Sequence, residues 1–343
     1  MHNDAPNGGL LHHEDLAVST PYVFAAGTVT RDEIIAFATA YDPQPPYVPR
    51  DGAAAAALCA SPLHACTIMM RSFCDGLLNR IASLGAPGVD EVKWHRPVRP
   101  GDVLRTRVTL VAKRALASRP DVGISKVVVE LLKADGEVTT SWITNQLVRR
   151  RGRGPAGDAP RQAARPPIVS LWQCARPATA RGCDVFFEDA RIGETTEFGS
   201  HVFGEEEIVA FARRFDPQPF HLDPARARVS LFGALCASGW HTAAIFLGRS
   251  VSARMHANAA ARARGVPLPA MEAPQAWRDL RWPRPVYVGD TVAFRARVAA
   301  QHDAGEHPER GIVTHEVQGR NQNGEIVLSF ATLTLVARRR AVA

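Results

Sequence analysis

The sequence FDPQPFHLD, residues 215–223, places Asp216 five positions before His221. Pro217 and Pro219 remove two backbone donors and hold their neighbours extended, so a regular helix is not expected here. An acid and a base held on a stiff loop suit proton transfer, although a Pro-rich turn with polar residues facing water has the same composition. A second, altered copy of the stretch elsewhere in the chain favours the first interpretation.

An internal duplication relates the two halves of the chain. The altered copy is YDPQPPY at residues 41–47, in the N-terminal half, in which Asp42 corresponds to Asp216 and Tyr47 to His221. Three further pairs of segments match in the same order: LCAS at 58–61 and 235–238, WHRPVRPGD at 94–102 with WPRPVYVGD at 282–290, and ADGEV at 134–138 with QNGEI at 322–326. Several independent matches in one order argue against chance.

Each copy has the same predicted layout, which is a short helix, the DPQP loop, a long apolar helical stretch and then strands. The helical stretches are expected at about 53–83 and 234–252. The strands are expected at 103–113, 126–133 and 138–148, and again at 291–299, 312–319 and 326–336. Alternating apolar and polar residues in these strands indicate a sheet with one wet face. The pattern predicts an α+β fold, with both copies joined in one sheet because each alone would leave a hydrophobic edge.

The predicted domains follow from the repeat. Residues 1–21 are expected to be a flexible tail, 22–148 the N-terminal unit, 149–183 an Arg- and Pro-rich linker and 184–340 the C-terminal unit. Residues 252–271 are expected to be an insertion in the C-terminal unit.

Composition limits the class of protein. The net charge of +7 permits nucleic-acid binding, but the Arg residues are scattered and seldom interleaved with aromatics, so no nucleic-acid partner is expected. The same charge suits a phosphorylated, anionic substrate. Six cysteines without a CxxC pair or metal-ligand spacing indicate reduced thiols, and no run of about 18 apolar residues is present. We therefore expect a cytoplasmic protein with no membrane partner, no metal and no cofactor.

The residues around the opening stretch resemble the MaoC-like hot-dog proteins, which include (R)-specific enoyl-CoA hydratases and related acyl dehydratases. The resemblance is carried by DPQPFHLD at 216–223, FEDA at 187–190, FGALCASGW at 232–240 and PVYVGDT at 285–291. It covers about 184–337 well and 22–148 more weakly. It implies a double hot dog, meaning two tandem hot-dog units whose antiparallel sheet wraps around long central helices, and a homodimer of such chains.

The resemblance also implies a chemistry, the hydration of an enoyl-CoA. Asp216 and His221 would be the acid–base pair, with Asp216 activating water and His221 holding the water and relaying the proton. A backbone N–H at the start of the central helix would stabilise the enolate oxygen, and Gly239 fits because no side chain blocks it. The expected substrate-binding residues are Gln218, Phe220, Ser238 and Trp240. Gln218 and Ser238 depart from the residues common in the family, which leaves the acyl group undefined.

The first copy lacks two of these groups. Tyr47 replaces the imidazole, and Pro62, which has no N–H, stands at the position of Gly239. We therefore expect the N-terminal unit to be inactive and to hold the acyl tail or to be structural. Two other functions remain open, a non-catalytic module that binds acyl thioesters and a hot-dog thioesterase.

Overall fold

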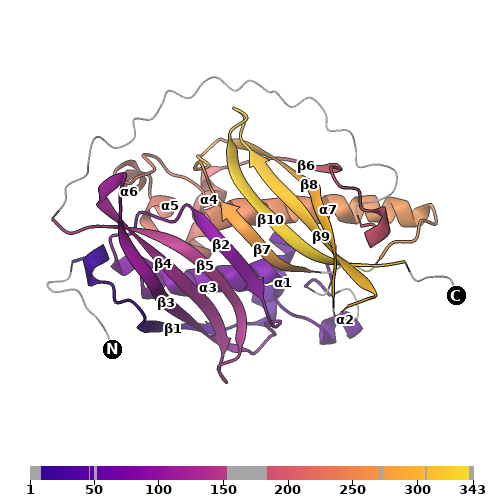
Figure 1. Cartoon of the computed structure of the whole chain (residues 1–343), viewed down its shortest axis with the longest axis horizontal. Coiled ribbons are helices and arrows are strands. Elements are labelled where there is room, and N and C mark those ends of the chain that lie inside the picture. Colours follow the sequence, from indigo (N-terminus) through magenta and orange to yellow (C-terminus); the bar gives the residue numbers. More distant parts are fainter. Residues whose placement is uncertain are drawn as a thin grey trace.

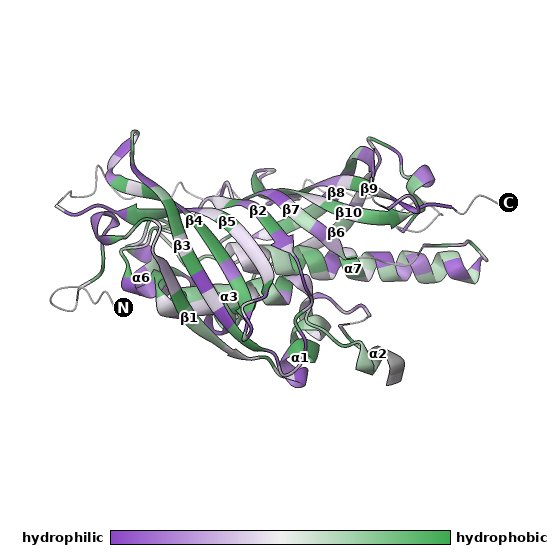
Figure 2. Ribbon diagram, turned by 60° about the horizontal axis from the view of Figure 1, so that its bottom comes forward, coloured by the Kyte–Doolittle hydropathy of each residue, from purple (hydrophilic) through white to green (hydrophobic). Residues whose placement is uncertain are grey.

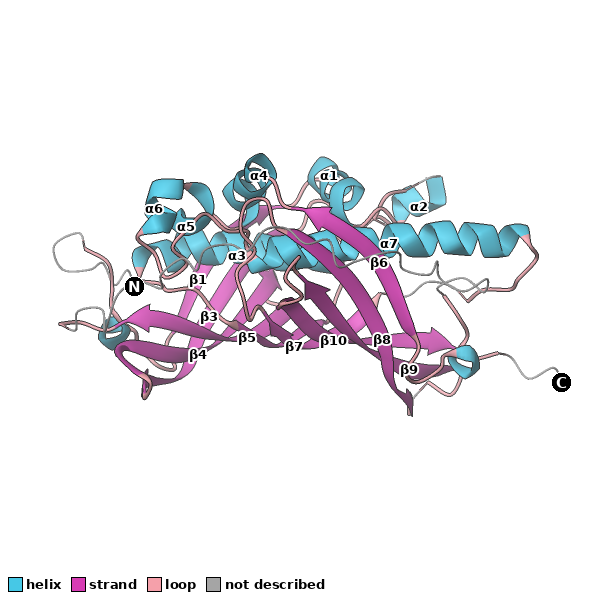
Figure 3. Ribbon diagram, turned by 90° about the horizontal axis from the view of Figure 1, so that it is seen from above, coloured by secondary structure: helices cyan, strands magenta, loops and turns pink. Residues whose placement is uncertain are grey.

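One antiparallel sheet of ten strands forms the base of the molecule, and the helices lie on one of its faces (Figures 1 and 3). The structure is a computed structural model, and it describes residues 9–45, 47–49, 52–152, 184–269, 273–305 and 307–339. The strands are β1 (Pro21–Thr28), β2 (Gly88–Trp94), β3 (Val103–Leu116), β4 (Arg119–Lys133), β5 (Val138–Arg149), β6 (Thr195–Val202), β7 (Pro274–Arg281), β8 (Thr291–Asp303), β9 (Arg310–Arg320) and β10 (Ile326–Ala337).

The strand order is β1-β3-β4-β5-β2-β7-β10-β9-β8-β6, so the second half of the sheet repeats the first in reverse. We call β1–β5 with their helices unit one, and β6–β10 with theirs unit two. The units join where β2 pairs with β7, for example Val92 opposite Trp277. This pairing removes the free edge that each unit would otherwise expose. The predicted continuous sheet and α+β class are confirmed.

The helices are α1 (Arg31–Tyr41), α2 (Gly52–Ala56), α3 (Pro62–Gly76), α4 (Glu205–Phe215), α5 (Pro219–Leu222), α6 (Pro224–Arg228) and α7 (Gly239–Ala263). The sheet curves around α3 and α7, the central helices of the two units (Figure 3). In β8, Val292, Phe294 and Ala296 are buried while their neighbours are not, as the period of a one-sided strand requires. Apolar residues from both units form one hydrophobic core between sheet and helices.

Helix α1 begins as its sequence predicts. The Thr30 hydroxyl accepts a hydrogen bond from the backbone N–H of Glu33, and the Glu33 carboxylate accepts one from the Thr30 N–H. The equivalent helix α4 begins after Gly204 and ends at Phe215, which leaves Asp216 at its C-cap. Both short helices therefore deliver the aspartate of a DPQP loop to the same position in their unit.

Several sequence expectations differ from the structure. All six predicted strands are present and up to seven residues longer, but β1, β2, β6 and β7 were not predicted. The first part of the expected insertion at 252–271 is helical, because α7 continues unbroken to Ala263 and is therefore longer than α3, its counterpart in unit one. Beyond the sheet, this outer part of α7 carries both hydrophilic and hydrophobic residues (Figure 2). Residues 270–272 lie outside the described residues.

Two other corrections concern the loop and the N-terminus. Pro219–Leu222 form one helical turn, which the prolines allow because Pro219 stands at its first position, where no backbone donor is needed. Residues 9–20 are not a loose tail, since Leu11 is buried and Lys113 donates to the carbonyls of His13 and Leu16 at 3.1 and 2.7 Å. Residues 1–8 and most of the predicted linker, 153–183, lie outside the described residues.

Candidate active site

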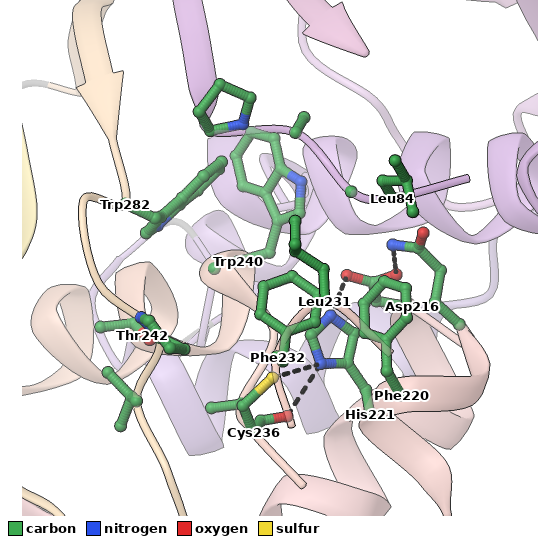
Figure 4. Close-up of a pocket in the computed structure, with 18 of the residues that line it drawn as sticks. Leu84, Asp216, Phe220, His221, Leu231, Phe232, Cys236, Trp240, Thr242 and Trp282 are labelled. Atoms are coloured by element: carbon green, nitrogen blue, oxygen red, sulfur yellow. Dashed lines mark hydrogen bonds and ion pairs between the residues drawn. The ribbon is translucent and has the colours of Figure 1, made fainter. Parts of the chain in front are cut away.

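A cavity of about 410 Å³ lies between the two units. Unit two contributes the end of the DPQP loop and the start of α7, and unit one contributes α3, β5 and the loop before β2. Its walls are mainly apolar and aromatic, and they include Phe73. Leu84, Phe232, Trp240 and Trp282, which also line the cavity, are labelled in Figure 4. A mainly apolar cavity with few polar groups is typical of a small-molecule site.

Asp216 is the central polar group of this cavity. It is only 2% exposed, and both carboxylate oxygens accept hydrogen bonds. Oδ2 accepts from Ser238 Oγ at 2.6 Å, and Oδ1 accepts from Gln218 Nε2 at 3.0 Å and from Cys74 Sγ at 3.2 Å. A buried carboxylate needs such partners, because an unpaired charge in the interior is costly.

His221 lies beside Asp216 on the single turn of α5 (Figure 4). Its Nδ1 is 2.8 Å from the carbonyl oxygen of Cys236, and because a carbonyl only accepts, Nδ1 carries the proton. The other ring nitrogen, Nε2, is 3.7 Å from Asp216 Oδ2. Burial lowers the pKa of His221 from its ordinary value, and this outweighs the opposing effects of Asp216 and the Cys236 carbonyl. The neutral ring therefore presents an unprotonated Nε2 toward the carboxylate.

Gly239 is the first residue of α7, and it lines the same cavity. Within the described part of the chain its backbone N–H has no partner, as expected for the first turn of a helix, where the helix dipole is also positive. A Cβ at this position would lie 2.3 Å from the Trp282 ring. Glycine is thus required by the packing of Trp282 on the helix end.

The expected substrate-binding residues divide into two groups. Gln218, Phe220 and Trp240 line the cavity as predicted. Ser238 is fully buried and does not line it. Its hydroxyl donates to Asp216 and accepts from the Trp240 N–H at 3.2 Å, so it caps α7 and orients the carboxylate.

The sequence analysis expected unit one to hold the acyl tail or to be structural, but it did not identify which residues of unit one line the cavity. Met70, Phe73, Leu84 and Trp142 form much of the cavity wall, and Trp142 packs against Trp240 with ring centroids 4.9 Å apart. Met70 and Phe73 are apolar members of a predicted helix and Trp142 of a predicted strand, and nothing in the local pattern distinguishes a cavity wall from a core. The repeat itself was the available signal, since it implied a partner unit next to the site.

Unit one keeps part of the polar arrangement. Asp42 accepts from Ser61 Oγ and from Gln44 Nε2, both at 2.5 Å, in the same pattern that Ser238 and Gln218 form around Asp216. Tyr47 and Pro62 occupy the positions of His221 and Gly239, as the alignment of the repeats predicts. A second cavity, about 330 Å³, is lined by these two residues and by His95, and Asp42 does not line it.

The other titratable residues near the two units are mostly buried in the core or paired with carboxylates. His64 and His241 are buried against Phe37 and Phe211, and burial lowers the pKa of each to about 3, so they are core residues. Arg281 pairs with Asp90 at 2.9 Å. Arg284 lies at the cavity with a side chain that is 65% exposed, and the distance from its Nε to Glu325 Oε1 is 3.7 Å. Among the described residues, no group of three or more His, Cys, Asp or Glu side chains is arranged to hold a metal ion.

Comparison with known structures agrees with this architecture. A putative MaoC domain protein dehydratase from Chloroflexus aurantiacus is 19% identical, with a TM-score of 0.69 over 97% of this chain and 99% of that chain. A conserved hypothetical protein of Mycobacterium tuberculosis, described as a double hotdog fold, is 17% identical, with a TM-score of 0.67 over 96% of this chain and 98% of that one. At these identities the likeness shows the fold, which is a double hot dog.

The family follows from sequence matches in unit two. The model of the MaoC like domain matches residues 188–321. A MaoC-like dehydratase from Rhodospirillum rubrum is 37% identical over 46% of this chain and 99% of its own, with a TM-score of 0.38. The chain belongs to the MaoC-like dehydratase family. No match was found among the curated proteins. None of the described helices combines the length and the apolar character needed to cross a membrane.

Proposed function

We propose that this protein is an acyl-CoA hydratase/dehydratase that reversibly adds water to a trans-2-enoyl-CoA and forms an (R)-3-hydroxyacyl-CoA. The observation that carries the proposal is the convergence of three groups on one cavity. These are the Asp216 carboxylate, the unprotonated Nε2 of His221 and the free N–H of Gly239. The stereochemistry is taken from the resemblance to the (R)-specific hydratases.

The geometry suits the activation of one water molecule. Asp216 Oδ2 and His221 Nε2 are 3.7 Å apart, too far for a direct hydrogen bond, and both accept. A water about 2.8 Å from each, the usual hydrogen-bond length, can donate one hydrogen to each and keep its lone pairs free. Asp216 then takes one proton as the water oxygen bonds to C3 of the enoyl group. The other hydrogen of the water stays on this oxygen as the new hydroxyl group, where His221 Nε2 holds it. The proton taken by Asp216 is then relayed by His221 to C2, which restores the carboxylate and the neutral ring.

The negative charge that develops on the thioester oxygen needs a donor. Gly239 supplies one from the first turn of a 25-residue helix, where the dipole adds to the effect of the N–H. Unit one has Pro62 at this position and therefore cannot make the same contact. The proposal assigns all the chemistry to unit two and the apolar wall for the acyl chain to unit one.

The remaining parts of the substrate are assigned by charge and polarity. The Met70, Phe73 and Leu84 wall suits an acyl chain, and Arg284 at the exposed side of the cavity suits the phosphates of CoA. The enzyme is proposed to work as a cytoplasmic homodimer without a cofactor, on the strength of the sequence expectations. Light scattering tests the dimer.

A product assay over a panel of enoyl-CoAs tests the proposed reaction. Crotonyl-CoA and longer trans-2-enoyl-CoAs are incubated with the protein, and the products are separated by chromatography. We expect 3-hydroxyacyl-CoA of the R configuration and no free CoA. Release of free CoA without a hydroxyacyl product would instead identify a thioesterase, and binding without turnover across the panel would identify a binding module.

A further inference from the structure

We propose that unit one supplies positioning residues for the acid–base pair of unit two, namely Cys74, Ser83 and Gln146, which hold Asp216 and Gln218 in their working orientation. The proposal rests on the proposed function, because it names residues that serve the same reaction. It gives the unit without catalytic groups of its own a part in the chemistry, beyond forming the wall of the cavity.

A chain of hydrogen bonds crosses from unit one to Asp216. Gln146 Nε2, on β5, donates to Ser83 Oγ at 3.0 Å, and Ser83 Oγ donates to Gln218 Oε1 at 3.2 Å. Gln218 Nε2 then donates to Asp216 Oδ1 at 3.0 Å. Each group in this chain donates to the next, and the chain ends at the carboxylate.

The direction of the chain fixes the Gln218 amide. Gln146 Nε2 can only donate, so Ser83 accepts from it and uses its own hydrogen for Gln218. Gln218 Oε1 therefore faces Ser83, and its NH2 group faces Asp216. Without Ser83 the amide loses the contact that favours this orientation, and the flipped amide would place an oxygen against the carboxylate. Ser83 thus acts on Asp216 through Gln218.

Cys74 provides a second contact from unit one. It lies on α3, is fully buried, and its Sγ is 3.2 Å from Asp216 Oδ1. Burial and the neighbouring Asp216 raise the pKa of the Cys74 thiol, so the sulfur keeps its hydrogen and donates it. Oδ1 is then held by Gln218 and Cys74 together. Oδ2, held by Ser238, is the oxygen that faces His221.

Unit two does not supply equivalent contacts to Asp42 of unit one, although the folds of the two units match. Asp42 has the same two partners within its own unit, Gln44 and Ser61. The spacing that relates Ser61 to Ser238 places Val251 opposite Cys74, and a valine has no hydrogen to donate. Across the described ranges, no side chain of unit two hydrogen-bonds to Asp42 or Gln44. The contacts from the neighbouring unit therefore serve only the aspartate that has a histidine beside it.

Unit one also holds the backbone of the same loop. Asn79 Nδ2 donates to the carbonyl of Pro217 at 3.1 Å, and Arg71 Nη1 donates to the carbonyl of Arg213 at 2.8 Å. These two contacts are exposed and therefore fix the position of the Asp216 loop less tightly than the buried contacts do. They lie on both sides of Asp216 in sequence, so the loop is tied to unit one before, at and after the carboxylate.

The test compares paired variants in crotonyl-CoA hydration, measuring kcat and KM separately. Ser83→Ala and Cys74→Ala are expected to lower kcat at least about tenfold with little change in KM, because a misplaced catalytic group costs rate without weakening binding. Ser83→Thr and Cys74→Ser keep a donor and are expected to recover most of the rate. Ser61→Ala, which removes the matching hydrogen bond in unit one, is the control and should leave kcat unchanged.

Each outcome supports or contradicts the proposal. If kcat of Ser83→Ala and Cys74→Ala stays within twofold of wild type while Asp216→Asn is inactive, the positioning role is wrong and the proposed function stands. If Asp216→Asn is as active as wild type, the proposed function itself fails. The positioning role would also be wrong if Ser83→Thr and Cys74→Ser lost as much kcat as the alanine variants, because equal losses would indicate a packing effect. Thermal unfolding midpoints identify any variant that does not fold, and the two sites provide independent tests.

Discussion

His221 Nε2 lies 3.7 Å from Asp216 Oδ2, while His221 Nδ1 donates to the Cys236 carbonyl at 2.8 Å. The second contact determines the first, because it fixes the tautomer and turns the unprotonated nitrogen toward the carboxylate. Two acceptors at this separation can share one water molecule.

The pH dependence follows from the burial of His221. Since burial lowers its pKa below the ordinary 6.5, the ring stays neutral at neutral pH and becomes protonated only at lower pH. A protonated ring cannot accept a hydrogen from water, so activity is lost as the pH falls. We expect the midpoint of any loss of kcat/KM caused by His221 to lie below pH 6.5. If the pH profile of kcat/KM instead showed that activity requires protonated His221 at a pH above 6.5, the proposed role would be contradicted.

Gly239 is predicted to be sensitive to the smallest substitution. A Cβ in Gly239→Ala would lie 2.3 Å from the Trp282 ring, so the ring or the helix end must shift. We expect a loss of roughly 1–3 kcal/mol in the free energy of unfolding, as for overpacked cores, and a fall in kcat because the N–H moves with the helix end. Denaturant unfolding and steady-state kinetics measure the two effects. Full activity and stability in Gly239→Ala would show that the close contact is unimportant.

The wall from unit one is predicted to set acyl-chain preference. Leu84→Ala enlarges the cavity and should raise kcat/KM for longer enoyl-CoAs relative to crotonyl-CoA, at a cost of about 2–5 kcal/mol in stability. Ala86→Leu, on the same loop, narrows the cavity and should shift the ratio the other way. Unchanged ratios in both variants would mean that the acyl chain lies elsewhere.

Asp42 gives a stability prediction with a defined sign. Burial raises its pKa from 3.8 to about 6, so the folded state binds a proton more tightly than the unfolded state. Its contribution is fully present below pH 3.8 and is lost as the pH rises through 6, in total roughly 3 kcal/mol. Asp42→Asn cannot ionise and should lack this loss. Unfolding free energies of both proteins between pH 4 and 8 measure it, and parallel curves would contradict the prediction.

The sequence predicted the fold through its repeat. Matched segments such as residues 94–102 and 282–290 gave the layout, and period-two alternation located six strands. Strands β2 and β7 were not predicted because their short segments lack alternation: in β7, Ala276 and Trp277 are both buried and Arg278 and Asp279 are both exposed. The α7 extension was missed because its Ala- and Arg-rich sequence resembles a surface insertion as much as a helix.

The candidate site was predictable where a residue type has few alternatives. His221 and Gly239 stood out because their counterparts Tyr47 and Pro62 lack the relevant groups, and Asp216 stood out because it lies five positions before His221 on the same Pro-rich stretch. The roles of Cys74, Ser83 and Gln146 could not be predicted. They depend on hydrogen bonds across the interface between units, and local sequence does not contain the register of that interface.

The most direct test of the central claim compares Asp216→Asn with Asp42→Asn in crotonyl-CoA hydration. The two aspartates have the same burial and the same Ser and Gln partners, but only Asp216 has an imidazole and a free helix N–H beside it. We predict that Asp216→Asn loses at least about a hundredfold in kcat, the usual scale for general acid–base catalysis, while Asp42→Asn keeps the wild-type rate. Equal rates for wild type and Asp216→Asn, or equal losses in both variants, would contradict the account.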